Sequence, residues 1–178
     1  MVKNAKKISI IGGSGTGKTT LAENLGKELN LPICHIDGIH HLENWKLRDK
    51  EERDKIILEK VAEPKWIMDG TYHSTLSQRL ESADLIIYLD YSSIAQVKGA
   101  LGRYFKNHGK EKREIPGCKE EMTWDFLLWV WQWRKYKRDE IIENLQKIDN
   151  GKVLIFKNRR QLNKWYKQEF DKKIICMD

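Results

Sequence analysis

The stretch Gly12-Gly-Ser-Gly-Thr-Gly-Lys-Thr19 decides the fold, because it matches the phosphate-loop pattern of glycine, any four residues, glycine, lysine, and serine or threonine. Its glycines leave backbone N–H groups open to a phosphate, and such groups form an anion-binding concavity. We expect Lys18 to act as a catalytic cation on the outer phosphates of ATP and Thr19 to bind Mg²⁺. The residues predicted to bind the nucleotide are Gly12, Gly13, Ser14, Gly15, Thr16, Gly17, Lys18, Thr19 and Thr20.

The residues on either side of this loop fit the motif. Residues 6–11 form a short run rich in isoleucine, which predicts a buried strand. Leu21, Leu25 and Leu29 recur at helical spacing after the loop. Strand, loop and helix is the arrangement that a phosphate loop requires, so the alternative of a flexible glycine turn is disfavoured.

Composition narrows the class of protein. The 178 residues are 40% hydrophobic and 33% charged, which suits one domain with its own core. No apolar run approaches the ~20 residues of a membrane helix, and the first strand follows the N-terminus directly, so we expect a cytoplasmic protein with no membrane partner. The net charge of +7 fits a protein that binds either nucleic acid or polyanionic small molecules.

Further apolar runs alternate with amphipathic stretches along the whole chain. This alternation predicts an α/β fold, a three-layer P-loop NTPase with a five-stranded parallel sheet and helices on both faces. We treat 1–178 as a single nucleoside-kinase-like domain with a small lid at about 106–120. Residues 39–48 are expected to form a loop. The predicted strands after the first are 31–36, 66–68, 85–89 and 152–156, with a small edge strand at 173–176; the later helices are 49–62, 74–80, 93–105, 121–145 and 161–170.

Three aspartates follow predicted strands and should gather at one edge of the sheet, where ligands bind in such folds. We expect Asp69 to bind Mg²⁺ together with Thr19. We expect Asp37 to be catalytic, orienting or deprotonating the hydroxyl of an acceptor. The alternative for both is a turn residue before a glycine. Asp90 is a weaker candidate, because the sequence after it resembles an ordinary helix start.

The predicted lid is rich in charge and contains two glycines and a proline. Phosphoryl transfer requires cations that follow the moving negative charge, so we expect Arg103 and Arg113 to be catalytic, and a loop that closes over the phosphates would exclude water. The alternative is a solvated basic loop. Further candidate cations are Lys110, Lys112, Arg134, Arg138, Arg159 and Arg160.

Residues 124–133 carry four tryptophans on one predicted helix. The favoured interpretation is packing against the core or against a partner. Base stacking with a single nucleic-acid strand is the alternative, because arginines and lysines follow at 134–138.

Four segments give the chain a resemblance to the topology modulation proteins (FlaR-related), an adenylate-kinase-like group of P-loop kinases. They are Trp66-Ile-Met-Asp-Gly-Thr-Tyr72, Arg79-Leu-Glu-Ser-Ala-Asp-Leu-Ile-Ile-Tyr-Leu-Asp90, Pro116-Gly117-Cys118 and Phe126-Leu-Leu-Trp-Val-Trp131. The resemblance implies ATP on the loop and a lid after the fourth helix. Adenylate kinases follow the aspartate-glycine pair with phenylalanine, proline and an arginine that holds the monophosphate; here Thr71-Tyr72-His73 stand instead, which argues against AMP as acceptor.

These features favour an ATP- and Mg²⁺-dependent kinase that phosphorylates a small molecule, nucleotide-like or carrying a hydroxyl. The alternative is a nucleotide-dependent regulatory protein that acts on DNA, as the name of the group suggests, with little kinase activity. A third hypothesis is a nucleotide-binding scaffold in which the tryptophan helix builds a dimer. The expected partners are ATP and an unidentified small acceptor, with nucleic acid less favoured, and the chain is expected to be a monomer or a homodimer.

Overall fold

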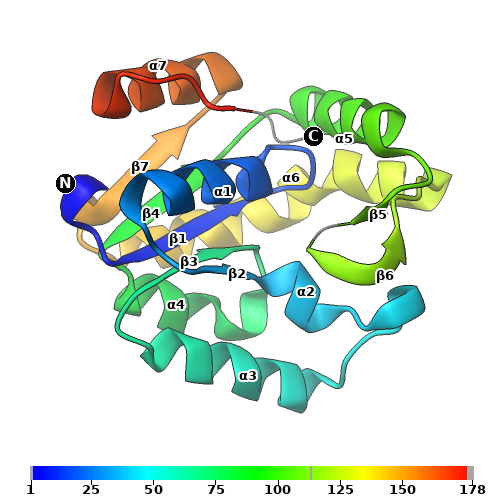
Figure 1. The fold of residues 1–178 in the computed structure, drawn as a ribbon, viewed down its shortest axis with the longest axis horizontal. Helices are drawn as coiled ribbons and strands as arrows, with labels where there is room; N and C mark the ends of the chain where they lie inside the picture. Colours follow the sequence, from blue (N-terminus) through cyan, green and yellow to red (C-terminus); the bar gives the residue numbers. More distant parts are fainter. Residues whose placement is uncertain (1, 113, 176–178) are drawn as a thin grey trace.

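A computed structural model describes residues 2–112 and 114–175. Five parallel strands form one sheet in the order β2-β3-β1-β4-β7 (Figure 1), which confirms the predicted five-stranded parallel sheet. The strands are β1 (Lys7–Gly12), β2 (Ile33–His35), β3 (Trp66–Asp69), β4 (Leu85–Leu89) and β7 (Val153–Phe156). The helices are α1 (Lys18–Leu29), α2 (Ile36–His40), α3 (Lys50–Ala62), α4 (Leu76–Ser82), α5 (Ser93–Asn107), α6 (Trp124–Gln146) and α7 (Arg159–Phe170).

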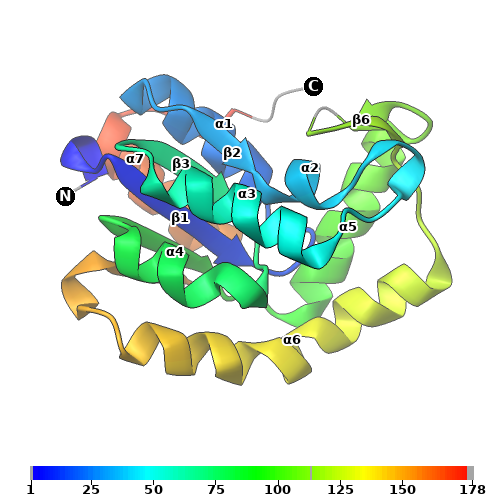
Figure 2. The same cartoon turned by 90° about the horizontal axis from the view of Figure 1, so that it is seen from below.

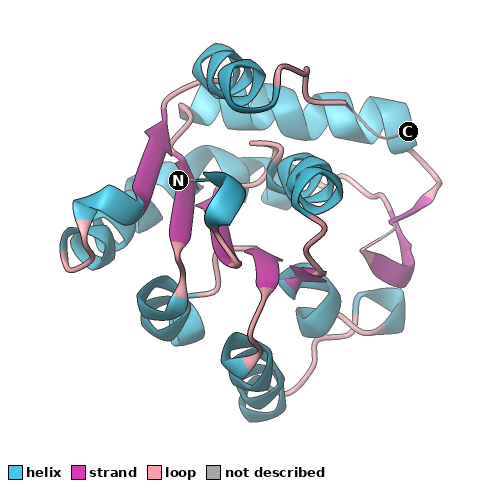
Figure 3. Ribbon diagram, turned by 60° about the vertical axis from the view of Figure 1, so that its left-hand side comes forward, coloured by secondary structure: helices cyan, strands magenta, loops and turns pink. Residues whose placement is uncertain are grey.

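Helices cover both faces of this sheet, and Figure 3 shows the strands between them. Side chains alternate between the two faces along each strand, so neighbouring strand residues enter different cores. Ile8 and Ile10 pack in one core with residues of α1 and α7, whereas Ile11 and Tyr88 pack in the other with residues of α3, α4 and α6. The three layers expected from the sequence are therefore present.

An antiparallel ribbon lies between α5 and α6, where the sequence predicts an irregular lid. It consists of β5 (Glu111–Lys112) and β6 (Ile115–Lys119). The sequence predicts a loop over these residues, and part of it is this ribbon instead: Ile115 and Cys118 are buried, and Cys118 contacts Leu42 and Trp45.

Two other local predictions differ from the structure. Residues 36–40 form the short helix α2 and Glu43–Trp45 a 3-10 turn, where a loop is expected from residue 39. The edge strand predicted at 173–176 is absent over 173–175, and Cys176 lies outside the described residues. The backbone of Ile175 pairs with the side chain of Asn24 instead of with a strand.

Helix α6 is the longest helix of the described chain, at 23 residues, and runs along the outer edge of the molecule (Figure 2). It packs beside α5 and covers the sheet face opposite α1. Within the ranges that the structure describes, no helix combines the length and apolar character needed to cross a membrane.

Candidate active site

The phosphate loop joins the end of β1 to the start of α1, at the edge of the sheet where all five strands end. Gly17 caps α1 with a φ of 90°, a left-handed conformation that favours glycine. The ammonium of Lys18 donates a hydrogen bond to Gly13 O (2.8 Å). Burial lowers the pKa of Lys18, and the negative charges of Asp37 and Asp69 oppose that shift. Lys18 is thus a partly buried cation held at the loop without a salt bridge to any described carboxylate, which suits a polyphosphate.

The loop touches α5 without any intervening side chain. A methyl group added at Gly15 would lie 2.5 Å from the backbone nitrogen of Ala100, and one added at Gly99 would lie 2.0 Å from Gly15 O. Both positions therefore require glycine for close approach of two backbones. This contact fixes the loop relative to the helix that carries Arg103.

Thr19 and Asp69 meet beside Lys18, as the sequence predicts. The hydroxyl of Thr19 donates to Asp69 Oδ2 (2.9 Å), and Asp69 ends the buried strand β3. His35 Nδ1 lies 2.6 Å from the other carboxylate oxygen. Burial opposes protonation of His35, but the hydrogen bond and charge of Asp69 outweigh it and raise the pKa of the imidazole.

The Thr19–Asp69 pair fits a magnesium ion. Mg²⁺ takes oxygen ligands at about 2.1 Å in octahedral geometry, and neighbouring ligands of such a site lie about 3 Å apart. Mg²⁺ is commonly held by one or two protein oxygens together with substrate phosphates, so this hydroxyl and carboxylate next to the phosphate loop are a sufficient donor set.

Asp37 lies on α2, directly after β2, and faces Tyr72. The phenol of Tyr72 donates to Asp37 Oδ1 (2.9 Å). Burial and the negative charge of Asp37 raise the pKa of Tyr72, so the phenol stays a donor at all workable pH values. His40 packs against the ring of Tyr72, at 4.7 Å between ring centroids. Asp37 thus has an oriented carboxylate in an aromatic surrounding.

The segment Thr71-Tyr72-His73, where adenylate kinases carry a different sequence, has a structural task. Thr71 Oγ1 accepts from the backbone N–H of Gly12 and donates to Gly12 O, both at 2.9 Å. The fully buried Arg79 donates to Gly70 O and Tyr72 O. The Thr71 bonds attach the turn after β3 to the beginning of the phosphate loop, and the Arg79 bonds attach the same turn to α4. Sequence reasoning missed the Thr71 bonds, because their partners are 59 residues apart.

Two lid cations converge on one buried carboxylate. Arg103 Nε donates to Glu120 Oε1 (2.9 Å), and Lys112 Nζ lies 3.7 Å from Glu120 Oε2. Glu120 is 4% exposed. The positive charges of Arg103 and Lys112 also lower the pKa of Lys18, after burial, which places both near the phosphate loop. The predicted catalytic Arg113 lies outside the described residues.

The ribbon packs onto the segment that follows Asp37. The backbone N–H of Trp45 donates to Cys118 Sγ (3.1 Å), and the Cys118 thiol donates to Leu42 O (3.3 Å). A methyl group at Gly38 would lie 2.2 Å from Glu114 O, so α2 and the ribbon are in backbone contact. The ribbon therefore covers the surroundings of Asp37, an arrangement that excludes water from them.

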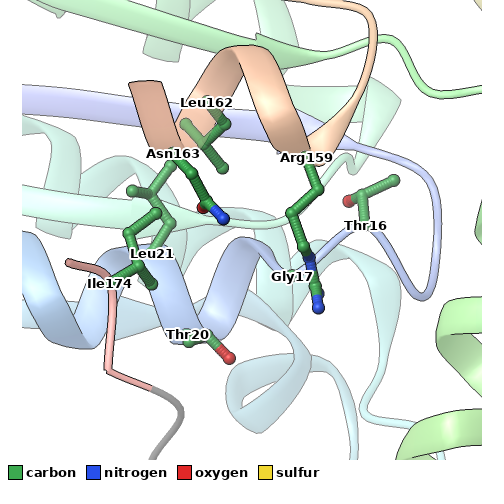
Figure 4. A pocket seen from close by; sticks show the side chains of 8 residues that line it. All are labelled: Thr16, Gly17, Thr20, Leu21, Arg159, Leu162, Asn163 and Ile174. Carbon is green, nitrogen blue, oxygen red and sulfur yellow. The ribbon is translucent and has the colours of Figure 1, made fainter. Parts of the chain in front are cut away.

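A pocket open to solvent adjoins the phosphate loop on the side of α7 (Figure 4). Arg159, at the start of α7, extends beside Gly17, and Leu21 and Leu162 supply apolar walls. Ile174, from the segment after α7, forms a further wall, and Asn24 holds this segment through two hydrogen bonds to the backbone of Ile175, both at 2.8 Å. Position and lining suit the base of a nucleotide whose phosphates lie in the loop.

Asp90, a weak candidate from the sequence, is committed to a buried ion cluster. Its carboxylate accepts hydrogen bonds from Arg134 (3.2 Å), Arg138 (3.1 Å) and Lys157 (2.5 Å). Burial opposes the charged form, but these cations outweigh it and lower the pKa of Asp90. The cluster ties α6 and the residue after β7 to the end of β4. Arg134 and Arg138 are engaged here and not with the phosphate loop.

Comparisons with known proteins agree with this geometry. Residues 8–89, from β1 to β4, match the model of the ATPase family associated with various cellular activities (AAA). No curated protein matches the chain in sequence. The family resemblance to topology modulation proteins is not among the matches and stays a prediction.

Solved structures of two kinds of kinase share the fold. Shikimate kinase from Acinetobacter baumannii superposes with a TM-score of 0.60 at 15% identity, covering 95% of each chain. A gluconokinase from Sinorhizobium meliloti 1021 gives a TM-score of 0.54 at 15% identity, covering 93% of this chain and 90% of that one. Shikimate kinase from Aquifex aeolicus gives 0.50 at 12% identity, covering 93% and 96%. The chain therefore has the α/β fold of P-loop kinases.

Proposed function

We propose that the protein is a kinase that transfers the γ-phosphoryl group of ATP to a hydroxyl group of a small molecule. The observation that carries this proposal is the hydrogen bond from Thr19 to Asp69 (2.9 Å) beside the partly buried ammonium of Lys18. This hydroxyl, carboxylate and ammonium are the groups that a P-loop enzyme uses on Mg²⁺ and the outer phosphates.

Each residue of the site has a task in this reaction. Lys18 binds the outer phosphates, and Arg103 and Lys112 stabilise the charge that develops on the transferred group. Bound Mg²⁺, held by Thr19 and Asp69, neutralises phosphate charge. Asp37 accepts the proton of the attacking hydroxyl, and Tyr72 keeps the carboxylate oriented through its hydrogen bond. The ribbon excludes water, which would otherwise compete with the acceptor.

The acceptor lies, in this proposal, between Asp37 and the ribbon. The fold relatives are a shikimate kinase and a gluconokinase, and shikimate and gluconate are both polyhydroxylated carboxylic acids. Such acids are therefore the first acceptors to test, followed by nucleosides and nucleoside monophosphates.

We favour a kinase over a DNA-acting regulator for one reason. A protein that only binds nucleotide has no need of an oriented Asp37, or of the buried Glu120 that holds Arg103 of α5 and Lys112 of the ribbon. These features are useful for a group-transfer reaction and are not required for nucleotide binding alone.

The test is an ADP-release assay with Mg-ATP across a panel of acceptors, with Lys18→Ala as the blank. The proposal predicts that one acceptor class stimulates ADP release and that Lys18→Ala lowers the rate ~10²-fold or more, as for loss of one transition-state charge contact. Lys27→Ala, a lysine in the last turn of the same helix, is the matched control and should stay active. ATP binding without stimulation by any acceptor would contradict the proposal.

A further inference from the structure

One side of α6 exposes large apolar side chains to solvent. Trp124 is 87% exposed, Leu128 55%, Trp129 51%, Trp131 52% and Tyr136 64%. Isolated exposed apolar side chains are normal on a protein surface, but a contiguous patch of this size marks an interaction surface.

These five residues lie in two rows on the outward half of the helix, and Asp125, Gln132 and Asp139 lie between the rows. Trp124, Leu128 and Trp131 follow each other at spacings of four and three residues, and Trp129 and Tyr136 form a neighbouring row seven residues apart. The opposite face of α6 carries Val130, Trp133, Ile141 and Leu145, which are buried in the molecule. The tryptophan-rich sequence is thus divided between the core and an outward surface, which lies along the edge of the molecule in Figure 2.

We propose that this face of α6 binds the same face of a second copy of the chain, with the two helices antiparallel. A two-fold axis near residue 130 brings Asp125 of one helix to the level of Lys135 of the other, and this pairing occurs twice. The same axis brings Leu128 to the level of Gln132 and Trp129 to the level of Trp131. Antiparallel pairing also places opposite ends of the two helix dipoles side by side.

The area of the patch is large enough for a stable pair. Aromatic side chains bury about 150–250 Å² each, so the exposed parts of these five residues amount to roughly 650 Å² per copy. Two copies would together bury roughly 1,300 Å², within the range of specific protein–protein interfaces.

Negative charge on the same side of α6 disfavours binding of nucleic acid or of a membrane surface. Asp125 and Asp139 are exposed among the aromatic side chains, and the side chain of Asp139 is 85% accessible. Carboxylates at these places repel both nucleic-acid phosphates and anionic lipid headgroups. Of the cations on α6 that could attract such anions, Arg134 and Arg138 pair with Asp90, and Lys137 pairs with Glu140. In a second copy of the chain, Lys135 supplies the positive charge that attracts these carboxylates.

The test is the mass of the full-length chain by sedimentation equilibrium over about 1–200 μM. We expect a monomer–dimer equilibrium, weakened at least ~10-fold by Trp131→Ala. Asp125→Lys should also weaken it, because it places lysine opposite Lys135 twice. The charge exchange Asp125→Lys with Lys135→Asp should restore the wild-type constant to within ~3-fold. Leu58→Glu, at an exposed apolar position of α3, is the control and should leave the constant unchanged.

Two results would overturn the inference. One is a wild-type chain that stays monomeric at every concentration. This result overturns the inference whether or not the wild-type chain binds anionic vesicles or single-stranded DNA. The other is a dimer that neither Trp131→Ala nor Asp125→Lys weakens. Circular dichroism of each variant separates a lost interface from a lost fold. The inference does not depend on the proposed kinase activity, so either can fail without the other.

Discussion

Tyr72 donates a hydrogen bond to Asp37 across 2.9 Å, and this contact joins the turn after β3 to the helix after β2. Both segments border the region beneath the ribbon. The bond gives the Asp37 carboxylate one fixed donor. No described side chain donates to its other oxygen, which is the one that an acceptor hydroxyl would meet in the proposed reaction.

The first prediction concerns this pair. Asp37→Asn should lower kcat ~10²-fold or more, because an amide does not accept the proton of the attacking hydroxyl. Tyr72→Phe should lower kcat/KM for the acceptor about 10-fold, on the scale of one hydrogen bond to a charged group. Calorimetry should give an unchanged Kd for Mg-ATP in both variants. Full activity of Asp37→Asn would remove the aspartate from the reaction.

Glu120 holds Arg103 and Lys112 and should act as a positioning residue. Glu120→Gln keeps the size of the side chain but loses the charge that aligns the two cations, so kcat should fall about 10–100-fold while KM for ATP changes little. Glu121→Gln, at the exposed neighbouring position, should behave as wild type. An equal rise of KM with constant kcat would instead assign Glu120 to ATP binding.

Arg159 lines the pocket beside the phosphate loop and should contact the base. Arg159→Ala should weaken ATP binding about 10-fold, the scale of one stacking contact of a cation with a ring. Binding of inorganic tripolyphosphate, which has no base, should stay unchanged when both are measured by calorimetry. Arg160→Ala, the next residue along α7, is the matched control. Equal losses for ATP and tripolyphosphate would show that Arg159 binds phosphate.

Asp90 should stabilise the fold in a pH-dependent way. Because its three cations lower its pKa in the native state, its contribution is complete above the ordinary pKa of aspartate and disappears as the pH falls through the lowered value. Asp90→Asn should therefore cost about 3 kcal/mol of unfolding free energy at pH 7, as for a broken buried ion pair. Urea titrations at pH 7 and below pH 3 should show this difference shrinking in acid.

The control for the acid series is Glu81→Gln, an exposed carboxylate on α4. Its unfolding free energy should equal that of the wild type at both pH values. A deficit of Asp90→Asn that is the same at pH 7 and in acid would mean that packing, and not charge, is the cause.

The sheet and the centre of the site follow from local sequence. The order strand, glycine loop, helix predicts the phosphate loop, and the rule that parallel strands end at one edge brings Asp69 to Thr19. Both predictions rest on residues whose positions are set by the backbone of a regular element. The same local logic fails at 173–176, where an isoleucine pair suggests a strand but Asn24 binds the backbone instead.

The remaining parts of the site depend on contacts between distant segments. No spacing in the sequence links the partners of three hydrogen bonds in the site. These bonds join Thr71 to Gly12, His35 to Asp69, and Arg103 to Glu120. Lys112 is identified by its position over Glu120 and beside the loop, not by its place in a basic run. Such pairings depend on tertiary packing. Tertiary packing leaves no repeating pattern in a single sequence from which the partners could be predicted.

The bare backbone contact between Gly15 and Gly99 holds the phosphate loop directly against α5. Not even a methyl group fits between the two backbones, so no side chain can cushion a displacement of one against the other. Helix α5 carries Arg103 in its last turns, where the guanidinium donates to Glu120. In the proposed kinase, the position of the loop would therefore set the position of a cation that acts on the transferred group.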